Sequence, residues 1–267
     1  MRAKKRLGQH FLSDPRILAR IADAVEATPA DTVLEIGPGP GGLTGQLAAR
    51  AGRVVAIERD VVLAQALAGR WPNVAVVEGD ALTADWHALA GPGHGGRWIV
   101  AGNIPYNITS PLIEKALEPP RPARAVYLMQ REVAERVAAA PGRAAYGALS
   151  VGVQAVAAVE LLFRVPAGAF TPRPKVDSML VRLTPRPFPL VADSARTSFR
   201  RLVVGLFGLR RKQLVRGLRE LTGWSAEIVA ASLAGAGIAA ELRPETLSPA
   251  AFAALYAALV DEGWRGG

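Results

Sequence analysis

Short apolar runs alternate with helical patterns through the first part of the chain. Apolar residues that recur every three or four positions predict helices, whereas short continuous apolar runs closed by Gly or a charged residue predict buried strands. The runs that predict strands are 32–36, 53–58, 74–77, 98–101 and 125–129. The segments that predict helices are 15–27, 43–51, 61–70, 110–117, 132–139 and 149–156. Strands that alternate with helices in this way predict βαβ units and a parallel sheet, which is the α/β class.

The pattern changes after residue 156. Two apolar runs, 159–165 and 179–183, are expected to pair as antiparallel strands, and the segment between them, 170–178, is too proline-rich for a regular element. Three prolines in 185–189 then mark a boundary. Beyond it the pattern is helical only, at 195–207, 211–221, 226–234 and 250–260. We therefore predict an α/β domain at 1–185 and a small all-α domain at 186–267.

The charge balance narrows the class of partner. The chain carries 32 Lys and Arg against 23 Asp and Glu, a formal net charge of +9, and its pI is about 10.6. A protein this basic is expected to bind a polyanion, either nucleic acid or an anionic membrane surface. The basic clusters available to contact phosphates consist of Arg2, Lys4, Lys5, Arg6, Arg173, Lys175, Arg200, Arg201, Arg210, Arg211 and Lys212.

Cysteine and histidine usage excludes several kinds of site. The chain has no Cys, which rules out disulfides, thiolate zinc sites and cysteine nucleophiles. The three histidines, His10, His87 and His94, lack metal-ligand spacing, so no metal is predicted. No long apolar segment follows the basic N-terminus, and no run approaches the roughly 18 apolar residues of a membrane span. We expect a soluble cytoplasmic protein with no membrane partner.

A glycine-rich turn follows the first predicted strand. Gly37, Gly39 and Gly42 fit the pattern G-x-G-x-x-G, and Glu58 ends the next strand about twenty residues later. Glycines between a strand and a helix permit a tight turn and a close approach of a ligand to the backbone, and the acid suits ribose hydroxyls. This arrangement is typical of dinucleotide sites. It also fits a nucleoside cofactor without a pyrophosphate, such as S-adenosylmethionine.

Two further carboxylates favour S-adenosylmethionine. Asp80 closes the third strand, where it can accept a hydrogen bond from an adenine amine, although a role in the turn alone is the alternative. Glu35 immediately precedes the glycine turn. Its negative charge is expected to lie near a cationic sulfonium, which is favourable, rather than near an anionic pyrophosphate, which is not.

The tetrapeptide Asn103-Ile104-Pro105-Tyr106 follows the fourth predicted strand. The carboxyl end of such a strand faces the ligand crevice of an open α/β sheet. A carboxamide, a proline and an aromatic ring at that place suit the binding of a flat ring that bears an amino group. Asn-X-Pro is also common as a simple turn at a strand end, so the tetrapeptide alone leaves both interpretations open.

Taken together, these motifs resemble the ribosomal RNA adenine dimethyltransferases that act on the small subunit. The resemblance runs over nearly the whole chain and is carried by Gln9-His10-Phe11-Leu12, Glu35-Ile36-Gly37-Pro38-Gly39, Glu58, Gly79-Asp80-Ala81, Asn103 to Tyr106, Leu128 to Ala134, Phe170 to Ser178 and Arg210 to Leu214. It implies a Rossmann-like, S-adenosylmethionine-dependent methyltransferase domain. It also implies dimethylation of the N6 amines of two adjacent adenines in a 3′-terminal hairpin loop of 16S rRNA. The implied partner is a 30S assembly intermediate in ribosome biogenesis, and a monomer is expected.

The resemblance also assigns site residues. The cofactor contacts it implies are His10, Leu12, Gly37, Glu58, Asp80 and Asn103, so residues 1–12 are expected to be both a basic arm and a cofactor-contacting segment. The catalytic residues it implies are Asn103, Ile104, Pro105, Tyr106 and Phe170. The chain departs from the family at position 10, where the family often has Asn, and at Ala148, where a basic residue is common.

The roles of these residues follow from the chemistry of an aromatic amine, whose lone pair is delocalised into the ring. Hydrogen bonds to the Asn103 side-chain oxygen and to a backbone carbonyl near Ile104 or Pro105 would favour a pyramidal, more nucleophilic nitrogen. Tyr106 is predicted to stack on one face of the adenine and Phe170 on the other, with an ordinary core position as the alternative for Phe170. No general base is assigned, because a carboxamide cannot take up the proton.

Other functions stay open from the sequence. A nicotinamide-dependent oxidoreductase would fit the glycines and Glu58 but leaves the tetrapeptide unexplained. A non-catalytic RNA-binding or assembly factor would fit the charge. Closer alternatives are a large-subunit rRNA adenine methylase of the antibiotic-resistance type and a transcription-factor relative. The 170–178 loop and the Arg-rich C-terminal helix favour the small-subunit enzyme.

Overall fold

The computed structural model describes residues 9–91 and 96–266. The predicted basic arm, with Arg2, Lys4, Lys5 and Arg6, lies outside the described residues. Among the helices of the described part, none is long and apolar enough to cross a membrane.

The contacts within the chain divide it into two units. The first contains the chain up to Ala134 together with Val159–Pro185, and the second contains Glu135–Ala158 together with the chain from Arg186 onward. Glu135–Ala158 groups with the helical unit because its helix α7 (Ala148–Gln154) packs against helices of that unit. The division into domains at residue 185 therefore stays a prediction.

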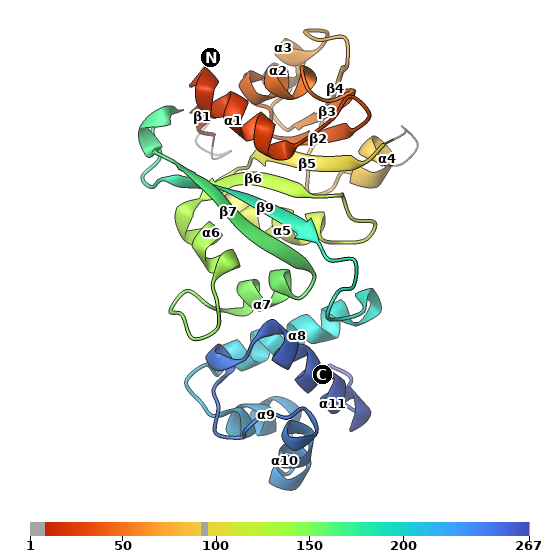
Figure 1. Ribbon diagram of the computed structural model, residues 1–267, viewed down its shortest axis with the longest axis vertical. Coiled ribbons are helices and arrows are strands. Elements are labelled where there is room, and N and C mark those ends of the chain that lie inside the picture. The colour runs from red at the N-terminus through yellow and green to blue at the C-terminus, as the bar shows by residue number, and fades with distance from the viewer. Residues whose placement is uncertain (1–8, 92–95, 267) are drawn as a thin grey trace. The chain divides into compact units, whose positions relative to one another are not determined.

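The first unit is built on a seven-stranded sheet (Figure 1). In the order in which they lie side by side, the strands are β4 (Val74–Glu78), β3 (Arg53–Glu58), β2 (Thr32–Ile36), β5 (Trp98–Asn103), β6 (Ala125–Gln130), β9 (Ser178–Pro185) and β7 (Ala157–Val165). The five strands from β4 to β6 are parallel, as predicted, and β9 runs antiparallel to β6. Strands β3 and β4 lie on one side of β2 in the sheet. Strand β5 and the strands that follow it in the chain lie on the other side. Ligands of open α/β sheets bind at such a reversal.

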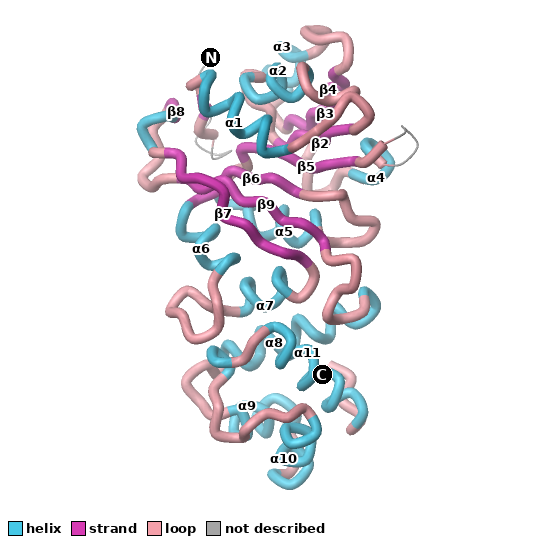
Figure 2. Tube along the Cα trace, viewed as in Figure 1, coloured by secondary structure: helices cyan, strands magenta, loops and turns pink. Residues whose placement is uncertain are grey.

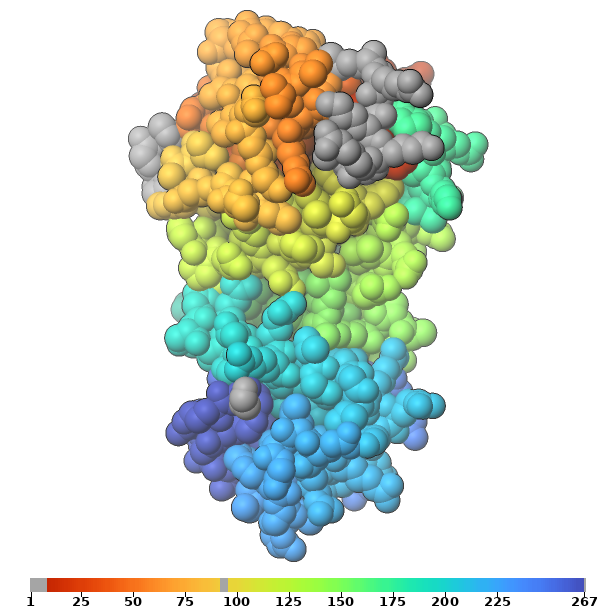
Figure 3. All heavy atoms as spheres, turned by 180° about the vertical axis from the view of Figure 1, so that it is seen from behind, coloured from red at the N-terminus to blue at the C-terminus, as the bar shows by residue number. Residues whose placement is uncertain are grey.

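Helices cover the sheet as the apolar pattern predicts. The helices of this unit are α1 (Pro15–Val25), α2 (Gly42–Ala48), α3 (Val61–Leu67), α4 (Trp86–Ala90), α5 (Thr109–Ala116) and α6 (Arg131–Ala138), which continues into the second unit. Helix α1 begins after Asp14, whose carboxylate accepts hydrogen bonds from the backbone of Arg16 and Ile17. Its buried side packs with α2 on the face of the sheet that carries Val33 and Ile99. The view from behind shows the segments that include α3, α4 and α5 as an orange and yellow surface (Figure 3).

A second, two-stranded sheet was not predicted. Strand β1 (Phe11–Leu12) pairs antiparallel with β8 (Phe170–Thr171), so that Leu12 lies opposite Phe170. The prediction that 170–178 contains no regular element is therefore wrong for its first two residues and for its last, Ser178, which begins β9. The two strands are far apart in sequence, and two-residue segments carry no periodicity, so no local pattern indicates the pairing.

Apart from Ala157 and Ala158 at the start of β7, the described part of the second unit contains only helices and loops (Figure 2). Besides α7, its helices are α8 (Arg196–Gly208), α9 (Leu214–Thr222), α10 (Ala226–Gly235) and α11 (Pro249–Asp261). Its core includes Tyr146 and Phe252, and the half-buried Phe207 stacks on Phe252 and meets Tyr146 edge-on. The start of α9 differs from the prediction at 211, because Gln213 is extended and the backbone N–H of Leu214 donates to the carbonyl of Leu242.

Candidate functional site

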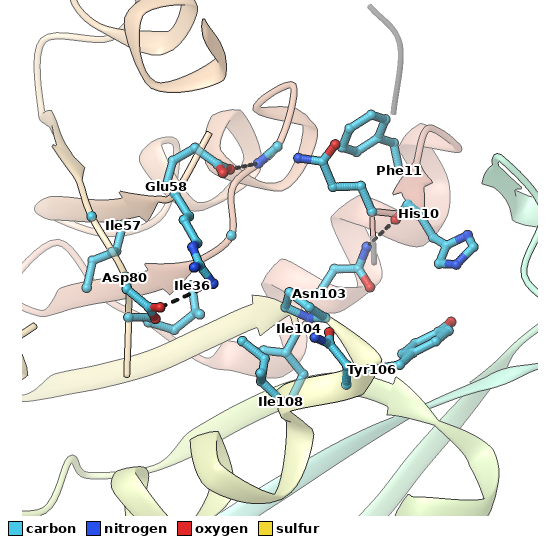
Figure 4. Close-up of a pocket in the computed structure, with 18 residues that line it drawn as sticks. His10, Phe11, Ile36, Ile57, Glu58, Asp80, Asn103, Ile104, Tyr106 and Ile108 are labelled. Atoms are coloured by element: carbon cyan, nitrogen blue, oxygen red, sulfur yellow. Dashed lines mark hydrogen bonds and ion pairs between the residues drawn. The ribbon is translucent and has the colours of Figure 1, made fainter. Parts of the chain in front are cut away.

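A pocket opens at the carboxyl ends of β2, β3, β4 and β5 (Figure 4). Its empty space, including the part open to solvent, is about 850 Å³. The lining residues are Gln9, His10, Phe11, Ile36, Gly37, Gly39, Ile57, Glu58, Arg59, Gly79, Asp80, Ala81 and Asn103 to Ile108. The sequence places these residues at strand ends, and the parallel sheet brings the strand ends to one edge.

The glycine turn is held in a conformation that favours glycine. Gly37 and Gly39 have φ of 66° and 56°, in the left-handed region. The backbone N–H of Gly39 donates to Oε2 of Glu58 at 3.0 Å. A Cβ on Gly39 would lie 3.1 Å from two ring carbons of Phe11, closer than ordinary van der Waals contact, so the ring leaves little room for a side chain there. The turn is thus fixed by an acid on one side and an aromatic ring on the other.

Glu58 decides which kind of nucleotide the turn can accept. Its other oxygen, Oε1, accepts from the backbone N–H of Asp60 at 2.8 Å, so both oxygens are oriented and each keeps a lone pair for a further donor. The side chain is buried, and this desolvation raises the pKa of the carboxyl group. A pyrophosphate would need the N–H of Gly39, which a carboxylate already occupies. The geometry therefore fits ribose hydroxyls and disfavours a phosphate.

Asp80 lies across the pocket from the glycine turn. Its Oδ1 accepts from the backbone N–H of Leu82 at 2.9 Å, and its Oδ2 lies 3.3 Å from Nη1 of Arg59. Sequence reasoning missed Arg59 as a lining residue, although its position directly after Glu58 was a usable signal. The carboxylate of Asp80 can accept from an adenine amine only in competition with this guanidinium, which is largely exposed.

The structure weighs against the expected electrostatic role of Glu35, which stays a prediction. Its side chain is only 1% exposed and does not belong to the pocket lining among the described residues, whereas its neighbour Ile36 does. Successive residues of a strand point to opposite faces, which explains the difference. Burial, reinforced by the charge of Glu58, raises the pKa of Glu35 to about 8. The raised pKa favours the neutral carboxyl at pH 7, which weighs against a negative charge beside a sulfonium.

Among the described residues, one hydrogen bond orients the carboxamide of Asn103. Its Nδ2 donates to the backbone carbonyl of His10 at 2.8 Å (Figure 4). A carbonyl can only accept, so the side-chain atom that faces it must be the nitrogen, and Oδ1 is left to accept from another donor. This is the orientation that binding an amine requires.

The tetrapeptide also offers one backbone acceptor. The carbonyl of Pro105 already accepts from the N–H of Ile108 at 3.2 Å and from Oγ1 of Thr109 at 3.3 Å. Within the described chain no donor reaches the carbonyl of Ile104, whose side chain is buried and fixes its position. Of the two carbonyls considered from the sequence, that of Ile104 is therefore the better acceptor.

Tyr106 and His10 lie next to Asn103. The Tyr106 hydroxyl is 2.8 Å from Oγ of Ser178, and its ring stacks on the imidazole of His10 with 5.5 Å between the ring centroids. Partial burial raises the pKa of the Tyr106 hydroxyl, so it stays neutral. Nδ1 of His10 lies 2.8 Å from the carbonyl of Pro172, which connects the N-terminal segment to the 170–178 loop.

Two predicted site residues do not line the pocket. Phe170 is 3% exposed and Leu12 is 8% exposed, and both pack in the core beneath α1. Alternate residues of the β1–β8 pair face opposite sides of the pair. Phe11 faces the pocket, so its neighbour Leu12 and the residue opposite Leu12, Phe170, face the core. The eight other predicted residues share the pocket: His10, Gly37, Glu58, Asp80, Asn103, Ile104, Pro105 and Tyr106.

The described basic residues differ in how available their charged groups are to bind an anion. Arg173 and Lys175 are exposed in the loop after β8. In the helical unit Arg210 forms an ion pair with Glu245, and Lys212 forms one with Glu220. The predicted phosphate contacts are therefore better supported in the loop than in these two helical-unit residues.

Comparison with known proteins places these features in a family. The sequence profile of the family described as ribosomal RNA adenine dimethylase matches residues 1–259. The chain is 44% identical to the ribosomal RNA small subunit methyltransferase A of Geobacter metallireducens, over 99% of this chain and 98% of that protein. It is 46% identical to the protein of the same name from Nitratidesulfovibrio vulgaris, over 95% of each chain.

Solved structures agree with this comparison. A dimethyladenosine transferase from Plasmodium falciparum is 28% identical with a TM-score of 0.83, covering 97% of this chain and 100% of that one. The 23S rRNA methyltransferase ErmE is 32% identical with a TM-score of 0.73, covering 94% of this chain and 99% of that one.

Proposed function

Because this chain belongs to the ribosomal RNA adenine dimethylase family, we propose that it dimethylates the N6 amines of two adjacent adenines in a 3′-terminal hairpin loop of small-subunit rRNA. The observation that carries the proposal is the orientation of Asn103. Its nitrogen is bound to the carbonyl of His10, so its oxygen is free to accept from an amine. Family membership also sets aside the nicotinamide-dependent oxidoreductase.

The pocket fits S-adenosylmethionine, which supplies an electrophilic methyl group on a sulfonium. The buried carboxylate of Glu58 is placed to bind ribose hydroxyls, and Asp80 to accept from the adenine amine of the cofactor. The turn at Gly37 lets the ligand approach the backbone. The occupied N–H of Gly39 and the carboxylate beside it argue for a nucleoside cofactor without a pyrophosphate.

The tetrapeptide acts by holding and orienting the target amine. We infer that Oδ1 of Asn103 and the carbonyl of Ile104 accept the two amine hydrogens, which draws the nitrogen lone pair out of conjugation with the ring. Pro105, with φ of −59°, keeps that stretch of backbone in place, and Tyr106 stacks on the adenine. Catalysis then comes from alignment and desolvation, and the proton of the methylated ammonium leaves to water.

The substrate is proposed to be 16S rRNA in a 30S assembly intermediate, bound by a cytoplasmic monomer during ribosome biogenesis. The net charge of +9 and the exposed Arg173 and Lys175 support binding to RNA phosphates. A large-subunit substrate of the antibiotic-resistance type is the second candidate, supported by the likeness to ErmE. The higher identity to the small-subunit methyltransferases favours 16S rRNA.

Methyl transfer from tritiated S-adenosylmethionine tests the proposal. The acceptors are 30S particles that lack the modification and, in parallel, unmodified large subunits, with the products mapped by reverse transcription. We expect two adjacent modified adenines in the small subunit only. Asn103→Ala should nearly abolish transfer while leaving cofactor binding measurable by calorimetry. Near-normal turnover of that variant, or modification of the large subunit instead, would contradict the assignment.

A further inference from the structure

Helix α3 is connected at both ends to the groups that are proposed to bind the cofactor. At its start, the backbone N–H of Asp60 donates to Oε1 of Glu58 at 2.8 Å, and the carboxylate of Asp60 accepts from the N–H of Val62. After its end come Arg70 and Trp71, which lie against the glycine turn. The helix thus joins the acid proposed to bind ribose to the outer side of the turn.

Trp71 packs against the glycine turn and the first part of α2. A Cβ on Gly41 would lie 2.9 Å from Cη2 of Trp71, and a Cβ on Gly45 would lie 3.2 Å from its Cζ2. Gly41 has φ of 90°, which by itself favours glycine. Gly45 lies inside α2, where glycine is destabilising relative to alanine. The space that the indole occupies therefore accounts for the glycine at position 45.

Arg70 holds the backbone of the turn directly. Its Nη1 donates to the carbonyl of Pro40 at 2.9 Å, and its Cζ lies 4.5 Å from the centroid of the Trp71 ring. Within the same turn the N–H of Gly41 donates to the carbonyl of Pro38 at 3.0 Å. One guanidinium therefore connects the indole to the backbone of the turn.

These contacts lie outside the pocket. Within the described chain, neither Arg70 nor Trp71 lines it, whereas Gly37 and Gly39 do. The turn thus has an inner side that faces the ligand and an outer side that faces these two side chains. Glycine has no side chain to restrict its backbone, so contacts from outside are needed to keep such a turn in one conformation.

We propose that Arg70 and Trp71 are positioning residues for the cofactor, which hold the glycine turn from outside in the conformation that accepts S-adenosylmethionine. The inference rests on the proposed placement of the cofactor against the glycine turn and Glu58. Glycine loses more conformational freedom on ordering than any other residue. Contacts that order the turn in the free protein remove that loss from the binding step, so they raise affinity without touching the ligand.

Calorimetry of the full chain with S-adenosylhomocysteine tests the proposal. Arg70→Met keeps an unbranched side chain but removes the donor to Pro40, and Trp71→Ala removes the indole. Substitutions that touch no ligand change the coupling to it by roughly 2- to 30-fold, and we expect each variant to lose affinity by a factor of that order. Arg70→Lys keeps a charged donor and Trp71→Phe keeps a flat ring, so both should recover part of the loss.

A matched control separates positioning from a general loss of stability. Trp264 is a buried indole of the helical unit and packs edge-on against Tyr256. Trp264→Ala should lower the melting temperature and leave the affinity for S-adenosylhomocysteine unchanged. Arg70 is exposed, so Arg70→Met should weaken binding while its melting temperature stays close to that of the wild type.

Steady-state kinetics give a readout that a merely structural role would not move. In Arg70→Met and Trp71→Ala, the KM for S-adenosylmethionine should rise, because the turn is no longer held for binding. The kcat at saturating cofactor should stay close to that of the wild type, because neither side chain lines the pocket in which the reacting atoms meet.

Wild-type affinity for S-adenosylhomocysteine in both Arg70→Met and Trp71→Ala would overturn the inference. An equal loss of affinity in Trp264→Ala would do the same, because stability alone would then explain the effect. Failure of the proposed function gives a different result. A wild-type protein that binds S-adenosylhomocysteine but transfers no methyl group to 30S particles would overturn the rRNA assignment and leave the positioning role intact.

Discussion

Replacing Glu35 by Gln should remove a pH dependence from the stability of the α/β unit. The wild-type carboxyl is buried in β2, and Oε2 finds no hydrogen-bond donor among the described residues. Its pKa is raised to about 8 from an ordinary value of 4.5, first by burial and then by the charge of Glu58. Glutamine has nearly the same shape and does not titrate, so the variant isolates the cost of ionising this one group.

The sign and size follow from linkage. Between pH 4.5 and about 8 the unfolded chain has lost the proton of Glu35 while the folded chain still holds it. Stability therefore falls as pH rises through this window and levels off above the folded pKa. One pKa unit corresponds to about 1.4 kcal/mol, so the whole shift corresponds to an upper value of about 5 kcal/mol. Between pH 6 and 8 alone the loss should approach about 2 to 3 kcal/mol.

Urea unfolding at a series of pH values measures this effect. Tryptophan fluorescence follows unfolding, and three of the five Trp residues, Trp71, Trp86 and Trp98, lie in the α/β unit. The informative quantity is the difference in unfolding free energy between Glu35→Gln and the wild type. Glu58 titrates in both proteins, so its own contribution largely cancels in that difference. A change in unfolding free energy caused by the glutamine amide itself is the same at every pH. It therefore does not alter how the difference between the two proteins depends on pH.

We expect the difference to grow in favour of Glu35→Gln from pH 6 to 8 and then to stay constant. Parallel curves for the two proteins would refute the reasoning, because they would mean that Glu35 is already ionised in the folded protein at neutral pH. A difference that grows toward low pH would reverse the sign of the pKa shift. Either result would restore Glu35 as a possible negative charge near the cofactor.

Three further predictions concern the pocket, the core and the RNA. Gly39→Ala, at φ 56° and 3.1 Å from the ring of Phe11, should weaken S-adenosylhomocysteine binding in calorimetry, whereas Gly142→Ala, at φ 79° with open space around it, should not. Tyr127→Phe should leave stability unchanged or raise it by about 1 kcal/mol in urea unfolding, because the buried hydroxyl has no partner among the described residues. Filter binding of the target hairpin should weaken steeply with salt, and a flat dependence would count against phosphate contacts.

The sequence by itself determined the elements that depend on neighbouring residues. The strands β2, β3 and β5 begin where their apolar runs begin, and α1 begins at Pro15, the first residue of its predicted segment. The glycine turn, the strand-final acid and the tetrapeptide were all found, because each is a short motif at a strand end. A parallel sheet brings strand ends to one edge, so local motifs were enough to predict eight of the residues that line one pocket.

Only the tertiary structure decided the features that depend on contacts between segments distant in sequence. The β1–β8 pair joins segments that are distant in sequence, and it buries Phe170 while placing Phe11 against the glycine turn. The same segment brings His10 to Asn103, which orients the carboxamide. The protonation of Glu35 likewise depends on which face of β2 is buried and on a neighbouring strand. Burial and pairing between distant segments leave no periodicity in the chain, so these features could not be derived from the sequence.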